Sequence, residues 1–217
     1  MRTDNPEALR LKSNTIDARH SRPPSIYSQA TIERGELMIQ RMIGAALFNA
    51  ETYEEIEADP GAIGQAVLVV LLVTLCGAVG GVIGGLLGDA SALRILFGVI
   101  AGLVFGIVRW AIWVSVLSLV GGMMLRTGST HTSWAEIGRV VGFAYTPGIL
   151  SIFSFVPFIG WLFPLVAWFW TLAAVTVAVR QALDFESTGR AIAVVLVAAV
   201  IGFIPWIIIV IVQATLL

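Results

Sequence analysis

The sequence has few charged residues and a single cysteine. Charged residues make up 12% of the chain and hydrophobic residues 58%, whereas about 25% charged residues is usual for soluble domains. The lone cysteine, Cys76, excludes a disulfide framework and a cysteine-ligated metal site. The composition excludes a nucleic-acid binder, whose affinity depends on clustered positive charge, and a net charge of −1 implies no bulk electrostatic partner. A 23.2 kDa globule cannot bury so much apolar surface, so the composition predicts a membrane protein with no nucleic-acid partner.

Motifs that carry chemistry are also missing. The sequence has no HExxH, no GxSxG with a histidine partner and no phosphate-binding loop. Its two histidines, His20 and His131, are isolated from other metal-ligating side chains. The long apolar runs contain no Asp, Glu or His, which argues against an ion-coupled transporter. We therefore expect no catalytic residue, no cofactor and no metal.

Five apolar runs of about membrane-spanning length are present. A helical span needs about 20 apolar residues, and none of the runs alternates as a barrel strand does. The fold class that follows is all-α, a polytopic membrane protein with five transmembrane helices. The expected spans are residues 62–87, 96–124, 137–155, 158–179 and 191–212 of a membrane domain over 61–217.

Two segments precede the membrane domain. Residues 1–28 lack apolar periodicity and are expected to form a disordered cytosolic tail. Residues 29–60 form an amphipathic helical segment, with Arg41 on its polar face. Its first helix lies either in the headgroup interface or on the protein's own cytosolic surface. Thr52 and Glu55 offer a capping box for a short acidic helix that follows.

The distribution of basic residues predicts the orientation. Eleven of the thirteen Lys and Arg residues lie on one side of the predicted spans, Arg94 lies on the other and Arg109 lies within the second span. Because cytoplasmic loops carry the excess of positive charge, we expect a cytoplasmic amino terminus and an external carboxyl terminus. Five crossings, an odd number, also place the two termini on opposite sides of the membrane.

Glycines recur every four residues in the first two spans. Such ladders of small residues let membrane helices approach closely. We expect them to pack the first two spans together within one chain; the alternative is a homodimer seam. The ladder residues are Gly77, Gly81, Gly85, Gly98, Gly102 and Gly106.

Arg109 is the ionisable residue deep within a span. It should face protein or water, because exposing its charge to lipid costs a few kcal/mol. Trp113, one turn away, offers a cation–π contact, and Tyr145 and the Phe143 carbonyl are candidate hydrogen-bond acceptors. This arginine is either structural or part of a site for an anion or lipid headgroup. Helix kinks are expected in the third, fourth and fifth spans at Pro147, Pro164 and Pro205.

Three stretches resemble motifs of the Yip family of membrane proteins, in particular its prokaryotic branch. Residues 48–60 resemble the motif before the first span, residues 142–147 a third-span motif, and residues 179–191 the turn into the last span. The resemblance covers about residues 35–212, although Ala50 stands where the family often has proline. It implies a five-span membrane protein that acts through partners or lipids, located in a prokaryotic inner membrane.

Three functions are compatible with the sequence. The first is a non-enzymatic Yip-type scaffold that recruits partners or organises membrane, with lipids, membrane proteins or a second copy as partners. The second is an accessory subunit of a larger membrane complex, contacted through outward-facing aromatic residues, namely Trp110, Trp161, Trp168, Phe169 and Trp170. The third is a small-solute permease that uses Arg109 and the proline-bent helices.

Overall fold

The computed structural model describes residues 26–88, 90–124 and 133–216. The chain divides into two compact units, Met1–Met38 and Ile39–Leu217, and each is described by itself. The described part of the first unit is the beginning of helix α2 (Ile26–Ala46). Most of the predicted tail, residues 1–28, falls outside the described residues, but the helix starts three residues earlier than expected.

The second unit begins with the end of α2 and a short acidic helix, α3 (Ala50–Ala58). The side chain of Asn49 caps α3 by accepting a hydrogen bond of 3.3 Å from the Thr52 amide. The predicted capping box at Thr52 is therefore wrong, since the helix begins before that residue. Phe48 has a left-handed backbone (φ 61°), which turns the chain sharply between α2 and α3.

The remaining elements are long apolar helices. They are α4 (Ala62–Leu87), α5 (Ala92–Met124), α6 (Trp134–Ala144), the 3₁₀ helix η1 (Thr146–Phe155), α7 (Leu162–Ala182) and α8 (Thr188–Leu216). Three of them, α4, α5 and α7, are long and apolar enough to cross a membrane, and α6 with η1 can form a fourth, bent span. Within α8, the described residues give a shorter apolar helix, Thr188–Ile204. The all-α, polytopic membrane fold is confirmed, while the count of five spans stays a prediction.

The three prolines differ in effect. Pro147 is the second residue of η1, just after the 43° bend between α6 and η1. Pro164 lies in the first turn of α7, where a missing amide hydrogen breaks no helical hydrogen bond. The expected kink at Pro164 is therefore wrong: this proline helps to begin a helix. Helix α8 continues through Pro205 without a break.

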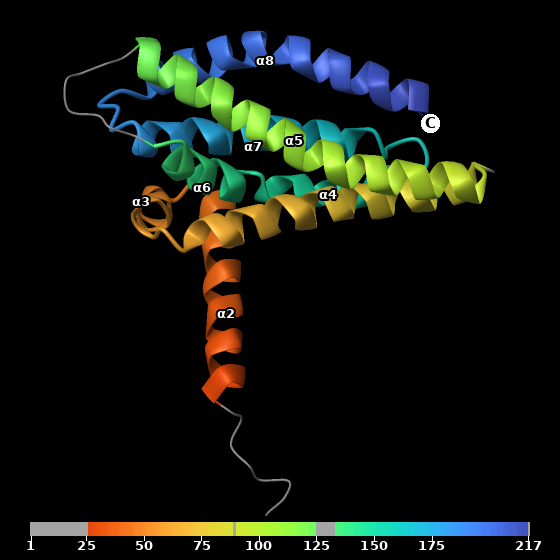
Figure 1. Ribbon diagram of the computed structural model, residues 1–217, viewed down its shortest axis with the longest axis horizontal. Helices are drawn as coiled ribbons and strands as arrows, with labels where there is room; N and C mark the ends of the chain where they lie inside the picture. Colours follow the sequence, from red (N-terminus) through yellow and green to blue (C-terminus); the bar gives the residue numbers. More distant parts are fainter. Residues whose placement is uncertain (1–25, 89, 125–132, 217) are drawn as a thin grey trace, which may run out of the picture. The chain divides into compact units, whose positions relative to one another are not determined.

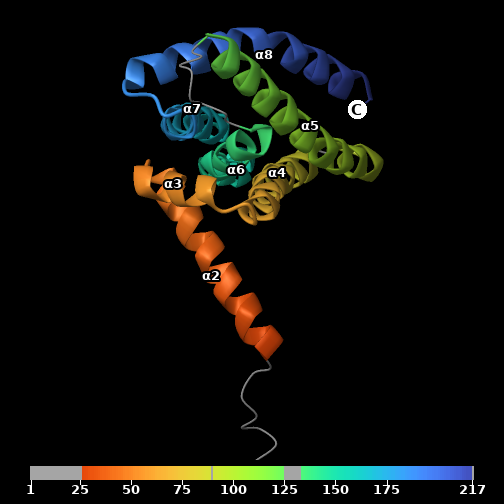
Figure 2. The same cartoon turned by 60° about the vertical axis from the view of Figure 1, so that its left-hand side comes forward.

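Within the second unit the long helices lie side by side and alternate in direction, as Figures 1 and 2 show. One end of this bundle holds α3, the start of α4 and the end of α7, where Gln181 bonds to Glu54. We call it the α3 end. The opposite end, the far end, holds the end of α4, where Gly84 approaches Phe155 of η1.

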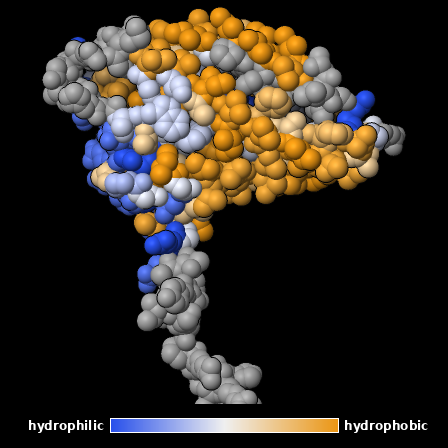
Figure 3. Space-filling view, in the orientation of Figure 1, coloured by the Kyte–Doolittle hydropathy of each residue, from blue (hydrophilic) through white to orange (hydrophobic). Residues whose placement is uncertain are grey.

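The buried core lies mostly in the half of the bundle near the α3 end. In α4 the buried apolar residues stop at Val70, and in α5 they begin only at Trp110. In α8 they lie between Ala191 and Ala198. Figure 3 shows hydrophilic atoms gathered at the α3 end and hydrophobic atoms along the helices. An apolar surface of this extent is what a bilayer covers.

Candidate functional site

Two regions stand out by their chemistry: a network of polar side chains at the α3 end, and a cavity between α4 and α5. Arg41 is the centre of the network. Its guanidinium donates to Glu55 (2.9 and 3.0 Å), to Asp59 (2.8 Å) and to the side-chain oxygen of Gln65 (3.0 Å). This arginine thereby joins the end of α2 to α3 and to the first turn of α4.

Arg41 is only 4% exposed, so its expected place on the solvent face of the amphipathic helix is wrong. Its hydrogen-bond acceptors come from later in the chain. These hydrogen bonds, rather than the polar face of the helix, determine where the side chain lies. The apolar residues Ile39, Ile43 and Leu47 are exposed instead. The Ala46 carbonyl accepts a hydrogen bond of 2.8 Å from Trp170 of α7. The end of α2 therefore packs beside a membrane helix and exposes an apolar stripe.

A second buried arginine, Arg139 of α6, holds α3 from the other side. It is 7% exposed, and its guanidinium donates to the Glu57 carbonyl. The hydroxyl of Tyr53, buried in α3, donates to the Ala45 carbonyl at 3.0 Å. A complete capping box of Ser133 and Glu136 fixes the start of α6. Since these groups tie α3 to α2 and α6, the short helix has a defined position in the second unit.

Electrostatics at the α3 end are dominated by carboxylates. Burial, followed by the nearby carboxylates of Asp184 and Glu136, raises the pKa of Glu57 to about 7. The hydrogen bond from Arg41 has the opposite effect and lowers the pKa of Asp59. No role for Glu57 or Arg139 was predicted from the sequence. A signal for them exists in the sequence, because Glu57 lies five residues before the first predicted span and Arg139 lies two residues inside the third.

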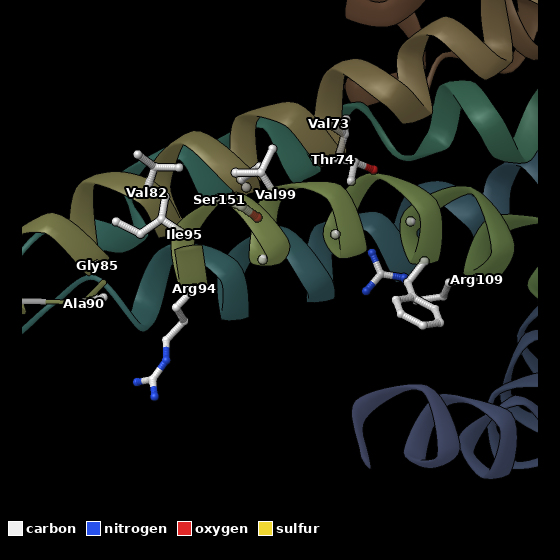
Figure 4. A pocket seen from close by; sticks show the side chains of 17 residues that line it. Val73, Thr74, Val82, Gly85, Ala90, Arg94, Ile95, Val99, Arg109 and Ser151 are labelled. Carbon is white, nitrogen blue, oxygen red and sulfur yellow. The ribbon is translucent and has the colours of Figure 1, made fainter. Parts of the chain in front are cut away.

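The cavity lies between α4 and α5 and has a volume of about 440 Å³. Both glycine ladders line it, and Arg94 and Arg109 of α5 lie along the same cavity (Figure 4). Thr74 of α4 and Ser151 of η1 also line it. The lining contains no carboxylate among the described residues, so its charge is positive.

The expected close packing of the two ladders is wrong for their central members. A Cβ atom built on Gly81 or Gly102 meets nothing within 4 Å. Close contacts are made elsewhere: a Cβ on Gly106 would lie 2.5 Å from the Thr74 hydroxyl, and one on Gly80 would lie 2.7 Å from the Ser151 carbonyl. The α4 seam therefore runs against η1 through Gly80.

Two other ladder glycines make looser contacts. A Cβ on Gly77 would lie 3.7 Å from the Ser151 side chain, and one on Gly85 would lie 3.3 Å from Ile95. Gly98 lines the cavity. The spacing of the glycines was a correct signal for small side chains, but it did not tell which neighbour each glycine faces.

The contacts expected of Arg109 are not those that the structure gives. Trp113 packs against Gly202 of α8, and no cation–π pair with Arg109 occurs in the part of the chain that the structure describes. The Phe143 carbonyl accepts a hydrogen bond of 2.7 Å from the Thr146 hydroxyl. Tyr145 is near enough for an electrostatic interaction with Arg109.

The tryptophans named as a possible contact surface divide into two groups. Trp110 is buried and packs edge-on against Trp134 with ring centroids 5.7 Å apart, so its expected outward position is wrong. The α7 residues Trp161, Trp168 and Phe169 are exposed. The aromatic surface is therefore a feature of α7.

Comparisons with known proteins identify a family over most of the chain. The family model described as the Yip1 domain matches residues 43–209. This region starts near the end of α2 and contains the Arg41 partners, the cavity and Arg139. No curated protein and no solved structure matches the chain.

Proposed function

This chain belongs to the Yip1-domain family of membrane proteins, and we propose that it is a non-enzymatic scaffold that recruits a protein partner to the membrane. The family consists in general of non-enzymatic trafficking membrane proteins. One observation carries the proposal: α3 is held in place by buried side chains while its outer surface remains open. The recruiting surface would be this helix.

The surface of α3 suits a partner with positive charge. Glu51 and Glu54 are exposed, Glu55 is exposed and paired with Arg41, and the arginines that hold α3, Arg41 and Arg139, are buried. The charge presented to a partner is therefore negative. Complementary charge accelerates encounter and discriminates between partners more than it adds affinity. A basic segment or basic protein surface is the partner chemistry that fits.

The same proposal assigns the α3 end to the cytoplasm. Arg180 and Arg190 lie at this end with Arg41 and Arg139, and Arg94 lies at the far end. Positive charge marks the cytoplasmic side of inner-membrane proteins. The exposed stripe of Ile39, Ile43 and Leu47 would then lie in the cytoplasmic leaflet, in the interface where apolar helix faces are inserted.

Photo-crosslinking in cells tests the recruiting role. A photoreactive residue at Glu51 in the full chain should give protein adducts of discrete mass. Glu54→Lys should reduce their yield at least fivefold by reversing the charge beside the probe. Glu186→Lys makes the same change at the α3 end outside α3 and should leave the yield unaltered. A yield of protein adducts that Glu54→Lys leaves unchanged would refute the proposal. Labelling of lipid alone would also refute it.

A second candidate function is an accessory subunit of a membrane complex, which the exposed aromatic residues of α7 favour. Trp161 is 67% exposed and Phe158, just before α7, is 97% exposed. A photoreactive residue at Trp168 separates the two functions. A stoichiometric protein adduct at this position supports the subunit, and lipid adducts there support the scaffold.

A further inference from the structure

The cavity between α4 and α5 has a charged end at Arg109, whose side chain is exposed. In the part of the chain that the structure describes, neither ion pair includes Arg109, which lies near enough to Tyr145 for an electrostatic interaction. A guanidinium in an apolar helix is costly without a partner. Figure 4 shows the Arg109 guanidinium beside α5, whereas the Arg94 side chain points away from the other labelled side chains.

The depth of Arg109 in the bundle restricts what can pair with it. The neighbouring Trp110 contacts Trp134, the first residue of α6, and the Trp134 indole donates to Ser115 at 3.1 Å. Tryptophans gather at the level of lipid headgroups. The exposed Trp134 marks this level at Ser115, and Arg109 lies six residues of α5 further into the bundle, about 9 Å from the headgroup level of the leaflet at the α3 end.

The rest of the cavity is apolar and has room for a chain. Gly81 and Gly102 leave open space where other residues would place a side chain. From Arg109 to Arg94 the cavity wall follows α5 for about 22 Å at 1.5 Å per residue. Its volume of about 440 Å³ lies within the range of about 300–1,000 Å³ typical of ligand sites.

We propose that this cavity binds one anionic phospholipid from the leaflet at the α3 end. The phosphate pairs with the Arg109 guanidinium, and one acyl chain lies along Gly102 and Gly81 toward the far end. Arginine suits this role because its planar fork donates two hydrogen bonds to a phosphate. The lipid site is independent of the recruiting surface on α3, so either can fail without the other.

Lipid binding to the full chain tests the proposal. The protein is purified in detergent, stripped of lipid and titrated with phosphatidylglycerol or phosphatidylcholine, and bound lipid is counted by native mass spectrometry. We expect one phosphatidylglycerol per chain, bound at least about tenfold more tightly than phosphatidylcholine, which corresponds to about 1.4 kcal/mol. Arg109→Gln should remove this preference. Arg109→Lys should keep part of it, because the charge remains without the fork.

Matched variants separate the site from general charge effects. Arg190→Gln removes an exposed arginine in the first turn of α8 and should change nothing. Gly102→Leu fills the cavity and should weaken the binding of both lipids. If Gly102→Leu fails to fold, Gly81→Leu is used in its place. Melting temperatures without lipid verify folding.

Four results would overturn the proposal. The first three concern phosphatidylglycerol and phosphatidylcholine: equal binding of the two lipids by the wild type, an unchanged preference in Arg109→Gln, and full binding by a folded glycine variant; a fourth concerns oleate. Binding of oleate but not phosphatidylglycerol would also overturn it, since the site would then take a free fatty acid.

Discussion

The two halves of the membrane bundle are built differently from similar residues. Near the α3 end the helices are in close contact: a Cβ on Gly142 of α6 would lie 2.6 Å from the Cβ of Ala66 in α4. In the other half, α4 and α5 leave a cavity beside Gly81 and Gly102. Gly80, in the same half, lies close against Ser151 of η1, so within the far half glycine serves close packing toward η1 and open space beside α5. We conclude that the α3 half and the contact of α4 with η1 stabilise the fold, and that the α5 side of α4 in the far half is free to bind lipid.

The largest expected difference between the halves comes from the same substitution at two glycines. Gly142→Ala should cost about 2–3 kcal/mol of unfolding free energy, because the new methyl group meets the side chain and backbone of Ala66. Gly81→Ala should cost less than about 0.5 kcal/mol, since it meets nothing. Denaturant unfolding of both variants in one detergent measures the contrast. Equal losses would remove the distinction between the halves.

A smaller effect is expected from the polar network at the α3 end. Arg41→Gln should cost about 1–2 kcal/mol, because it removes charged hydrogen bonds whose acceptors are partly open to solvent. Arg41 lowers the pKa of Asp59, so its stabilising effect should be full above the usual Asp range and decline at lower pH. Arg34→Gln, an exposed change in α2, is the control. A variant as stable as wild type at pH 7 would contradict the role of Arg41.

The smallest expected effect is the pH dependence of Glu57. Folding raises the pKa of this carboxyl from about 4.5 to about 7, so the folded state holds its proton more tightly and stability falls as pH rises through this interval. After allowance for solvent screening, we expect a loss of about 1 kcal/mol. Glu57→Gln should flatten this decline. Melting temperatures from pH 4.5 to 8 test it; parallel curves for variant and wild type would contradict it.

The sequence predicted the helices well, because hydropathy and membrane thickness determine them directly. The first predicted span, 62–87, coincides with α4, and the run 137–155 corresponds to α6 plus η1. Pro147 correctly marked the bend within that run. Pro164 was misread because a proline near the start of a helix and a proline within one look alike in an unbroken apolar run.

The sites were harder to predict, because they depend on which helices become neighbours. Arg41 fitted the polar side of a helix until its acceptors, 14, 18 and 24 residues away, were placed beside it. The carbonyl of Phe143 was a candidate hydrogen-bond acceptor for Arg109, but in the structure it accepts a hydrogen bond from the Thr146 hydroxyl. Periodicity identifies small and polar positions; it does not give the partner of each.

Oxygen accessibility in a lipid bilayer tests the contrast between the halves most directly. In a Cys76→Ser background, single cysteines at Gly102, at Val141 and at the exposed Leu196 of α8 would carry nitroxide labels, with oxygen collision measured by power saturation. We predict that the Gly102 label collides with oxygen nearly as often as the Leu196 label, and several-fold more often than the buried Val141 label. A Gly102 label as protected as the one at Val141 would show that the far half is packed, and would contradict the account.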